Sequence, residues 1–226
     1  MDSEHRRLVE RLQDKNTSGD GSFRYVEGTL GGNHLILTQC GIGKVSAAVG
    51  ASELIRRFSP DCIVSTGVAG GIDACLKVTD VVASQRLVYH DVWCGDGNEY
   101  GQVQGFPASY EGCPSLLRHA LSLNEAGMES RIHSGLVCTG DRFITNRMEL
   151  DTIKQRFPGG LAVDMESAAI AQTCHLYNVP FLSFRIISDT PGVEDHASQY
   201  ADFWGTMAER SFLTIWTFLS TLPSNL

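Results

Sequence analysis

The chain has 226 residues and a formal net charge of −8, which suits one α/β domain with a substantial core. An acidic chain without a basic stripe argues against a nucleic-acid groove, and no apolar run approaches the roughly 20 residues of a membrane span. The seven cysteines are scattered singly, without a Cys-x-x-Cys pair. They are therefore expected to be reduced, as in a cytoplasmic protein.

Hydrophobic periodicity predicts alternating helices and strands in the first half of the chain. The predicted elements are, in order, an amphipathic helix over 2–13, a loop over 16–21, strands over 23–30 and 34–40, an Ala-rich helix ending near 58, and strands over 62–66 and 78–89. Gly31-Gly32 between the first two strands is a hairpin signal.

The second half continues the alternation. It predicts an aromatic loop over 90–113, a helix over 115–123, a strand over 133–138, a helix over 146–157, a strand that ends before Glu166, a buried helix that Glu166 opens, a strand that Asp189 ends, and an amphipathic helix over about 198–222. Solidly apolar strands with glycines at their ends indicate a mostly parallel sheet flanked by helices. A single domain over 1–226 is expected.

Two carboxylates lie at predicted strand ends, where open α/β sheets bind ligands. Glu166 also has an ordinary explanation as a first-turn acid, and Asp189 as a helix cap. Taken alone, each structural explanation is favoured. Their occurrence together with glycine-rich strand ends favours a site for one small molecule.

The glycine-rich turns leave several interpretations open. Gly41-Ile42-Gly43-x-x-Ser46 resembles a dinucleotide fingerprint, but the third glycine and the acid that should close the next strand are absent. It is either a packing turn or a set of N–H groups that face an anion or a sugar hydroxyl. Residues 67–71 form either a tight turn or a floor that a ligand ring approaches. Phe143 is either core or a stacking platform. The histidines show no metal-ligand spacing.

Seven motifs together resemble the 5′-methylthioadenosine/S-adenosylhomocysteine nucleosidases of the purine nucleoside phosphorylase superfamily. They are Gly41-Ile42-Gly43-Lys44-Val45-x-Ala47-Ala48, Thr66-Gly67-x-Ala69-Gly70-Gly71, Tyr89-His90-Asp91, Glu99-Tyr100-Gly101-Gln102, Gly140-Asp141-x-Phe143-Ile144, Val163-Asp164-Met165-Glu166 and Ile187-Ser188-Asp189. Each motif alone is weak, but their order along nearly the whole chain makes the resemblance specific.

The resemblance implies a three-layer α/β fold, with a mixed, mostly parallel central sheet flanked by helices. It implies hydrolysis of the N-glycosidic bond of methylthioadenosine or S-adenosylhomocysteine, which releases adenine and a thioribose product for methionine salvage. The partner would be a nucleoside, with no cofactor and no metal, and with neither nucleic acid nor membrane. The family also implies a homodimer, and the aromatic loop and the C-terminal helix are either core or part of its interface.

The family pattern also implies a role for each site residue. Asp189 would protonate a purine ring nitrogen, and Glu4 would activate the attacking water. The substrate-binding roles fall to Glu166 at the ribose hydroxyls, Met165 under the sugar, Phe143 and the backbone of Ile144 at the adenine, Ile42 at the alkylthio end, Val68, Ala69 and Gly70 at the floor, and Ser188 beside Asp189.

The proposed chemistry needs these residue types. Adenine leaves readily only after ring protonation, so Asp189 must hold a proton near neutral pH although free aspartate has a pKa of about 3.9. A carboxylate beside the ribose stabilises an oxocarbenium-like transition state. Glu4 beside the nucleophile would repel phosphate, which favours water. The alternatives are futalosine hydrolase, purine nucleoside phosphorylase or a non-catalytic nucleoside-binding protein.

Two departures from the family pattern carry expectations of their own. The family has an apolar strand before the segment that begins here at Met1, so the first central strand is expected to be missing and two buried edges to be exposed. Adding roughly six to eight apolar residues upstream should then raise activity and stability. Val68 stands where many relatives carry serine, and the loop over 93–98, which in the family helps close a neighbouring subunit's pocket, differs in length. These differences leave the preferred alkylthio group open.

Overall fold

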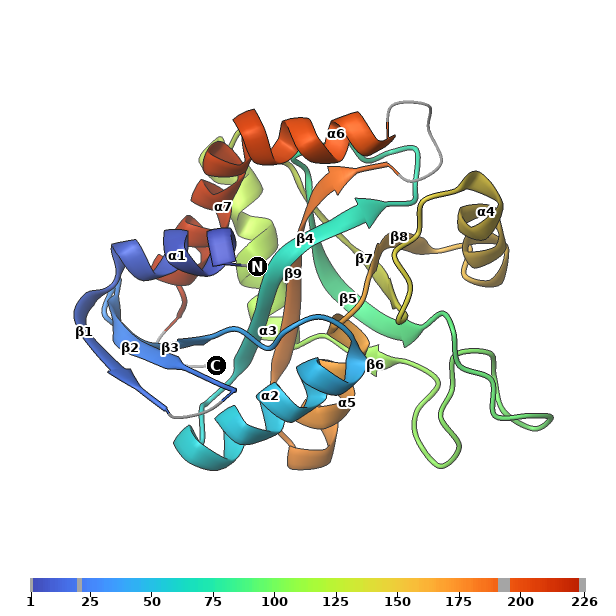
Figure 1. Cartoon of the computed structure of the whole chain (residues 1–226), viewed down its shortest axis with the longest axis horizontal. Coiled ribbons are helices and arrows are strands. Elements are labelled where there is room, and N and C mark those ends of the chain that lie inside the picture. The colour runs from blue at the N-terminus through green and yellow to red at the C-terminus, as the bar shows by residue number, and fades with distance from the viewer. Residues whose placement is uncertain (1, 20–21, 191–195, 224–226) are drawn as a thin grey trace.

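The computed structural model describes residues 2–19, 22–190 and 196–223, and Figure 1 shows their arrangement. Side chains are described for these residues except 2–4, 196–197, 205–206 and 208–211. The helices are α1 (Asp2–Arg11), α2 (Lys44–Phe58), α3 (Pro114–Ser122), η1 (Leu123–Ala126), α4 (Arg147–Arg156), α5 (Ser167–Tyr177), α6 (His196–Asp202), η2 (Phe203–Met207) and α7 (Ala208–Ser220). Among the described helices, none combines the length and hydropathy that crossing a bilayer requires.

Three strands form a small antiparallel sheet in the order β1-β2-β3. They are β1 (Gln13–Ser18), β2 (Tyr25–Leu30) and β3 (Asn33–Thr38). The predicted hairpin at Gly31-Gly32 is confirmed, because Leu30 pairs with Asn33. The loop predicted over 16–21 is wrong at residues 16–18, which belong to β1. Every residue of β1 is polar and most are exposed. The strand pairs with β2, but its sequence has no alternation of apolar and polar residues that would predict a strand.

Six strands form the main sheet, in the order β6-β5-β7-β8-β4-β9 with a further pairing between β5 and β9. They are β4 (Ile63–Gly71), β5 (Val81–Tyr89), β6 (Tyr110–Glu111), β7 (Ile132–Thr139), β8 (Gly160–Asp164) and β9 (Phe181–Asp189). The parallel ladders β4–β9 and β5–β7 are long, whereas each antiparallel ladder spans two or three residue pairs.

The β5–β9 pairing closes the main sheet on itself, so the sheet is mixed and barrel-like. The expected mixed, mostly parallel sheet is present, but it curls into a ring instead of forming the flat middle layer of a three-layer sandwich. The closing pairs join residues 81–83 to residues 184–186. A contact between segments about a hundred residues apart leaves no local signal in the sequence.

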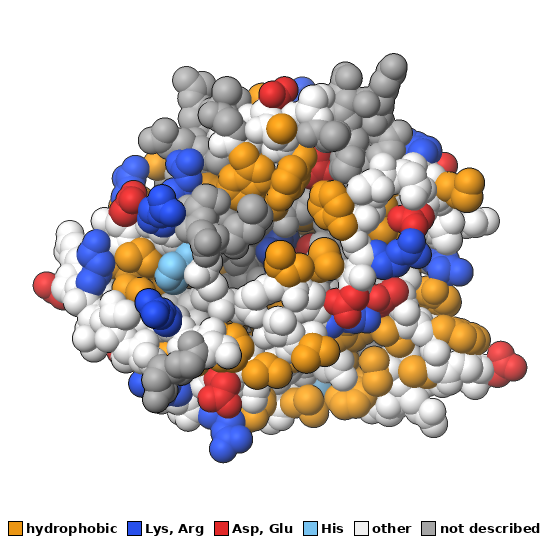
Figure 2. Space-filling view, in the orientation of Figure 1, with side chains coloured by type: hydrophobic (Ala, Val, Ile, Leu, Met, Phe, Trp, Pro, Cys, Tyr) orange, Lys and Arg blue, Asp and Glu red, His pale blue; other side chains and the backbone are white. Residues whose placement is uncertain are grey.

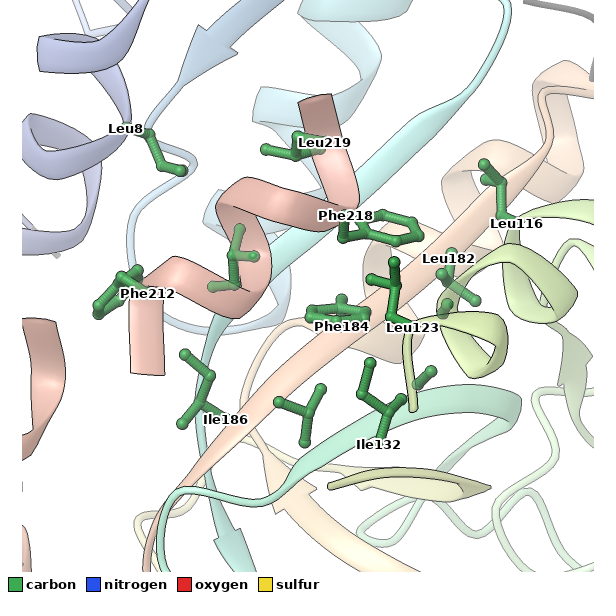
Figure 3. Packing of buried hydrophobic residues seen from close by; sticks show 14 of the residues in the cluster. Leu8, Leu116, Leu123, Ile132, Leu182, Phe184, Ile186, Phe212, Phe218 and Leu219 are labelled. Atoms are coloured by element: carbon green, nitrogen blue, oxygen red, sulfur yellow. The ribbon is translucent and has the colours of Figure 1, made fainter. Parts of the chain in front are cut away.

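The largest core cluster packs the C-terminal helix against the barrel. Phe184 of β9 and Phe218 of α7 stack with ring centroids 4.7 Å apart, and both are fully buried (Figure 3). The apolar face of this helix is therefore core, the first of the two interpretations of its sequence. Its single predicted helix is divided into α6, a π-helical turn and α7, and it bends between α6 and α7 (Figure 1). Residues nine apart face opposite sides of a regular α-helix, so this interruption lets both Phe203 and Phe212 be buried.

Two strand edges are open in the described part of the chain. β3 pairs only with β2, and β4 pairs with β9 along residues 63–70 and with β8 only at Gly70 and Gly71. The other edge of β4 has no strand beside it among the described residues.

A salt bridge joins the loop after β4 to α4. Lys154 Nζ lies 2.6 Å from Asp73 Oδ2 and also donates to the Gly160 carbonyl at 2.7 Å. The Cys75 N–H donates to the other oxygen of Asp73. The Lys154 hydrogen bond, followed by that of Cys75, lowers the pKa of Asp73 to about 2. The ionised form of Asp73 therefore stabilises this corner of the fold.

We expect Asp73→Asn to destabilise the protein at neutral pH by less than about 1 kcal/mol, since both partners are partly exposed. Because the folded pKa is depressed, the contribution is present above the unfolded pKa of about 3.9 and disappears as the pH falls towards 2. Urea denaturation between pH 7 and pH 2.5 measures this difference. Asp151→Asn, at an exposed i,i+4 pair, is the control. A deficit that stays constant across this range would contradict the assignment.

Candidate active site

The end of β4 lies between the ends of two other strands. Gly70 pairs with Val163 of β8 on one side and with Asp189 of β9 on the other. Met165 and Glu166 follow β8 directly. Asp189 and the strand that leads into Glu166 therefore flank the glycine-rich end of β4.

Asp189 is 3% exposed, and its neighbour Ser188 holds its orientation. The Ser188 hydroxyl donates to Asp189 Oδ1 and lies 3.4 Å from the Ala69 carbonyl oxygen. A register shift between Ala69 and Gly70 places Gly70 opposite Asp189. A carboxyl group is thus presented, nearly shielded from solvent, at the end of the barrel.

Glu166 caps α5 and receives a hydrogen bond from the turn that opens α2. The Gly43 N–H donates to Glu166 Oε1 at 3.1 Å, while Oε2 lies 3.7 Å from Arg185 Nη2. Gly43 has φ +88° and a Cβ there would lie 3.0 Å from Asp141 Oδ1, so glycine is required for this approach. Burial raises the pKa of Glu166, and the Arg185 charge opposes that rise. The Gly43 N–H of this turn therefore binds a carboxylate of the protein, whereas the sequence had suggested an anion or a sugar hydroxyl as its partner.

Arg185 is the charged centre of a buried polar network that links the main sheet to α5. Its Nε lies 2.9 Å from Asp164 Oδ2, and both side chains are almost fully buried. It also donates to Ser167 Oγ and to Ser65 Oγ, at 3.1 and 3.0 Å. Asp164 further accepts a hydrogen bond from Thr139 Oγ1 at 2.6 Å. The network joins β4, β7, β8, β9 and α5 immediately behind Glu166.

A second set of charges ties together three loops at the same end of the sheet. Lys44 Nζ lies 2.9 Å from both carboxylate oxygens of Asp91, and the Lys44 N–H donates to Asp141 Oδ1 at 2.7 Å. The Asp141 N–H donates to Asp91 Oδ2. These contacts fix the turn after β3 against the loops after β5 and β7.

The remaining predicted ligand residues are spread around this end of the barrel. Phe143 is 59% exposed, and its ring meets Tyr200 edge-on with centroids 5.9 Å apart. Ile144 is buried, Met165 is half-buried, and Ile42 is 70% exposed. On β4, Val68 is half-buried and Ala69 is buried. Phe143 is therefore not part of the core.

Glu4 belongs to α1, but its side chain lies outside the described residues, so its place relative to Asp189 is not described. The neighbouring His5 and Leu8 line a cavity of about 1130 Å³ between β3, β4 and α1, which Ile42 also reaches. No group of three or more His, Cys, Asp or Glu in the described part of the chain is arranged to hold a metal ion.

Arg185 and Lys44 are not among the site residues predicted from the sequence. Arg185 interrupts an otherwise apolar buried strand, and such a charge requires a partner. The sequence therefore indicates a buried charge at Arg185. It does not identify the partners of that charge, because Asp164 and Glu166 are brought to Arg185 only by the pairing of the strands.

The chain is similar to known proteins along most of its length. The family model described as Phosphorylase superfamily matches residues 1–220. The 5′-methylthioadenosine/S-adenosylhomocysteine nucleosidase of Chromohalobacter salexigens is 42% identical over 199 residues, which are 88% of this chain and 85% of that protein.

Two solved structures are similar over almost the whole chain. The nucleosidase from Neisseria meningitidis in complex with methylthio-immucillin-A is 35% identical with a TM-score of 0.92, covering 98% of this chain and 96% of that one. The Colwellia psychrerythraea enzyme in complex with adenine is 35% identical with a TM-score of 0.90, covering 97% and 91%.

Replacing Arg185 by glutamine should destabilise the fold by about 3–5 kcal/mol, because Asp164 and Glu166 would lose their buried counter-charge. Urea denaturation at pH 7 measures this loss. Arg86→Gln is the matched control: Arg86 is exposed on β5, and its replacement should change stability by no more than about 0.5 kcal/mol. Equal effects of the two substitutions would show that the buried network does not stabilise the protein.

Proposed function

The chain belongs to the 5′-methylthioadenosine/S-adenosylhomocysteine nucleosidase family of the phosphorylase superfamily, and we propose that it hydrolyses the N-glycosidic bond of these nucleosides. The products are adenine and the thioribose. The observation that carries the proposal is that Gly70, at one end of the barrel, pairs with Asp189 on one side and with the strand that leads into Glu166 on the other. This arrangement supplies one carboxyl group for the base and one for the sugar.

Asp189 is the general acid in this proposal. Asp189 is almost fully buried, and in this role it donates a proton to a purine ring nitrogen as the neutral carboxylic acid. Ser188 keeps the carboxyl group in one orientation. The electrons of the breaking C–N bond then move onto a neutral leaving adenine, and the ribose becomes oxocarbenium-like.

Glu166 binds the ribose hydroxyls, with Met165 beneath the sugar. The Glu166 carboxylate accepts the Gly43 N–H through one oxygen and faces Arg185 with the other. Each carboxylate oxygen can accept a further hydrogen bond, so the ribose hydroxyls can be added without breaking these contacts. A carboxylate there also stabilises the positive charge that develops on the sugar.

The other ligand residues surround the base and the 5′ substituent. Phe143 stacks on the adenine and the backbone of Ile144 reads its edge. Val68, Ala69 and Gly70 form the floor. Ile42 lies at the alkylthio end. The exposure of Phe143 and Ile42 supports these roles, since neither side chain is required by the core.

Glu4 activates water on the side of the sugar opposite the adenine. A carboxylate in that position repels phosphate, which makes hydrolysis the expected reaction. Incubation with methylthioadenosine, S-adenosylhomocysteine, inosine and futalosine, with and without phosphate, tests the assignment. Adenine release that does not depend on phosphate is expected from the first two substrates, and phosphate-dependent release of the base would overturn it.

The setting we propose is the cytoplasm, in methionine salvage. All seven cysteines are free thiols, which a reducing compartment preserves. The thioribose product retains the sulfur and the 5′ substituent of the substrate.

Asp189→Asn keeps the shape of the side chain but removes its acidic proton. We expect kcat for methylthioadenosine to fall by about 10²–10⁴-fold, with a much smaller change in KM, because the lost interaction belongs to the transition state. Steady-state kinetics measure the effect, and the melting temperature confirms folding. Asp151→Asn on the exposed face of α4 should retain full activity. Full turnover by Asp189→Asn would exclude the acid role.

A homodimer is the second part of the proposal. Ile42, Val45 and Val49 are 70%, 75% and 47% exposed, and their spacing places them on one face at the start of α2. Tyr177 of α5 forms a hydrogen bond with Ser52 of α2, in which the two hydroxyl oxygens lie 2.9 Å apart. Figure 2 shows hydrophobic side chains gathered over this lower face of the molecule. An exposed apolar face of this kind supports an isologous interface beside the alkylthio end of the site.

A Val45→Glu, Val49→Glu double variant should sediment as a monomer where the parent sediments as a dimer, because like charges would oppose each other across a two-fold interface. Its KM should rise if the partner subunit helps close the pocket. Met148→Glu introduces the same charge at a residue of α4 that is 79% exposed and lies off this face, and it should stay dimeric. A monomeric parent protein would refute the interface.

A further inference from the structure

The turn that leads into β5 holds one residue in a backbone conformation that its side chain disfavours. The Asp80 N–H donates to the Lys77 carbonyl at 3.0 Å, which closes a four-residue turn. Thr79, the third residue of this turn, has φ +81°. A positive φ at this position is typical of a type II turn, which favours glycine there, and for a β-branched residue it is an outlier. Such strain persists only where the surrounding contacts hold it, and it is concentrated at functional sites.

The strained turn binds the backbone of β9 just before the end of that strand. The Thr79 N–H donates to the Ile187 carbonyl, and the Ile187 N–H donates to the Asp80 carbonyl, both at 2.8 Å. Ile187 is fully buried and lies two residues before Asp189. Both backbone hydrogen-bonding groups of Ile187 are therefore held by the turn, on the edge of β9 that faces β5.

On its other edge, β9 changes its register with β4 directly after Ile187. Ala69 pairs with Ile187, but Gly70 pairs with Asp189, so β9 has one residue more than β4 at Ser188. An extra residue re-aims the side chains that follow it, and a slip of one residue turns a side chain to the other face of the sheet. The direction of the Asp189 carboxyl group therefore depends on where the extra residue falls.

The carboxylate of Asp80 anchors the turn to the neighbouring strand β7. Asp80 Oδ2 accepts the Lys77 N–H and lies 3.0 Å from His133 Nε2, at the start of β7. The side chains of His133 and Asp80 are only 16% and 13% exposed. The Val81 N–H also donates to the Arg131 carbonyl at 2.8 Å. The turn is therefore tied to the start of β7 by one side-chain and one backbone contact, and these contacts oppose relaxation of its strain.

We propose that Thr79 and Asp80 are positioning residues for the general acid Asp189. Their turn fixes Ile187, so the extra residue of β9 falls at Ser188 and the Asp189 carboxyl group faces the base. This role rests on the proposed function, in which Asp189 protonates the adenine. Neither residue of the turn touches the substrate, because both act through the backbone of β9.

The residues assigned to the sugar and the stacking face lie on other elements. Glu166 follows β8, and Phe143 follows β7. Loss of the turn therefore displaces the acid without removing the groups that bind the nucleoside. The kinetic signature of such a displacement is a fall in kcat with little change in KM.

Asp80→Ala removes the carboxylate that anchors the turn. We expect kcat for methylthioadenosine to fall about 10–100-fold and KM to change by less than about threefold, since a displacement of about 1 Å can lower a rate 10²-fold. Asp80→Asn retains an oxygen that can accept from Lys77 and from His133, and it should recover most of kcat. Glu27→Ala is the matched control: it removes a carboxylate 3.6 Å from His34 on the small sheet, and it should retain full activity.

Two substitutions test the backbone of Thr79. Glycine keeps the N–H and adopts a positive φ without strain, whereas proline lacks the N–H and fixes φ near about −65°. Thr79→Pro should therefore have a kcat at least tenfold below that of Thr79→Gly, with circular dichroism at the assay temperature to confirm folding. Equal kcat in the two folded variants would overturn the role of this N–H. The Asp80 variants make the same test with the backbone of the turn intact.

The double variant Asp80→Ala, Asp189→Asn separates positioning of the acid from a general loss of stability. If the turn acts through Asp189, adding Asp80→Ala to Asp189→Asn should lower kcat by less than about threefold. A further loss as large as that in the parent protein would overturn the positioning role. Unchanged kcat in Asp80→Ala alone would overturn it as well.

Hydrogen exchange tests the hold on Ile187 without any substrate. The Ile187 N–H should exchange at least tenfold faster in Asp80→Ala than in the parent protein or in Glu27→Ala, because its acceptor is the Asp80 carbonyl. Unchanged exchange would overturn the fixing of Ile187 by the turn. Faster exchange in the variant, together with no adenine release by the parent protein, would instead count against the proposed function.

Discussion

One buried guanidinium is held between two carboxylates where β8, β9 and α5 meet. Arg185 extends from β9 to Asp164 at the end of β8 and to Glu166 at the start of α5. Desolvating any one of these charges alone is costly, so each requires the others. Because the three lie on separate elements, their pairing fixes how the strand ends meet. The polar end of the barrel and the position of Glu166 are consequences of the same contact.

The two carboxylates of the candidate site have different surroundings. Glu166 faces a cation and a backbone N–H, a setting suited to accepting hydrogen bonds from hydroxyl groups. Asp189 is almost fully buried and accepts a hydrogen bond from the Ser188 hydroxyl. Gly70 pairs with Asp189 and with β8, the strand that leads into Glu166, and this supports assigning both groups to one nucleoside in the proposed function.

Short-range sequence patterns predicted the features of the fold that neighbouring residues determine. The hairpin at Gly31-Gly32 and the positions of Glu166 and Asp189 at strand ends follow from turn chemistry, periodicity and strand-end geometry. The polar strand β1 has no alternation, and the ring closure pairs β5 with β9 across about a hundred residues. Neither is encoded in a short window. The position of Arg185 in an apolar strand showed that a buried charge existed, but its partners are set by the three-dimensional pairing.

The candidate site residues lie on two parts of the fold, the end of the barrel and helix α1. Asp189 is placed by the strand pairings of the barrel, and Glu166 by Arg185 and by the Gly43 N–H of the turn before α2. The helix that carries Glu4 packs instead over the cavity between β3 and β4. Residues 35–38 and 63–66 border this cavity, and among the described residues no further strand pairs with them on that side. The two carboxylates at the barrel and the helix that carries Glu4 are therefore positioned by different contacts, so a substitution at one part can leave the other in place.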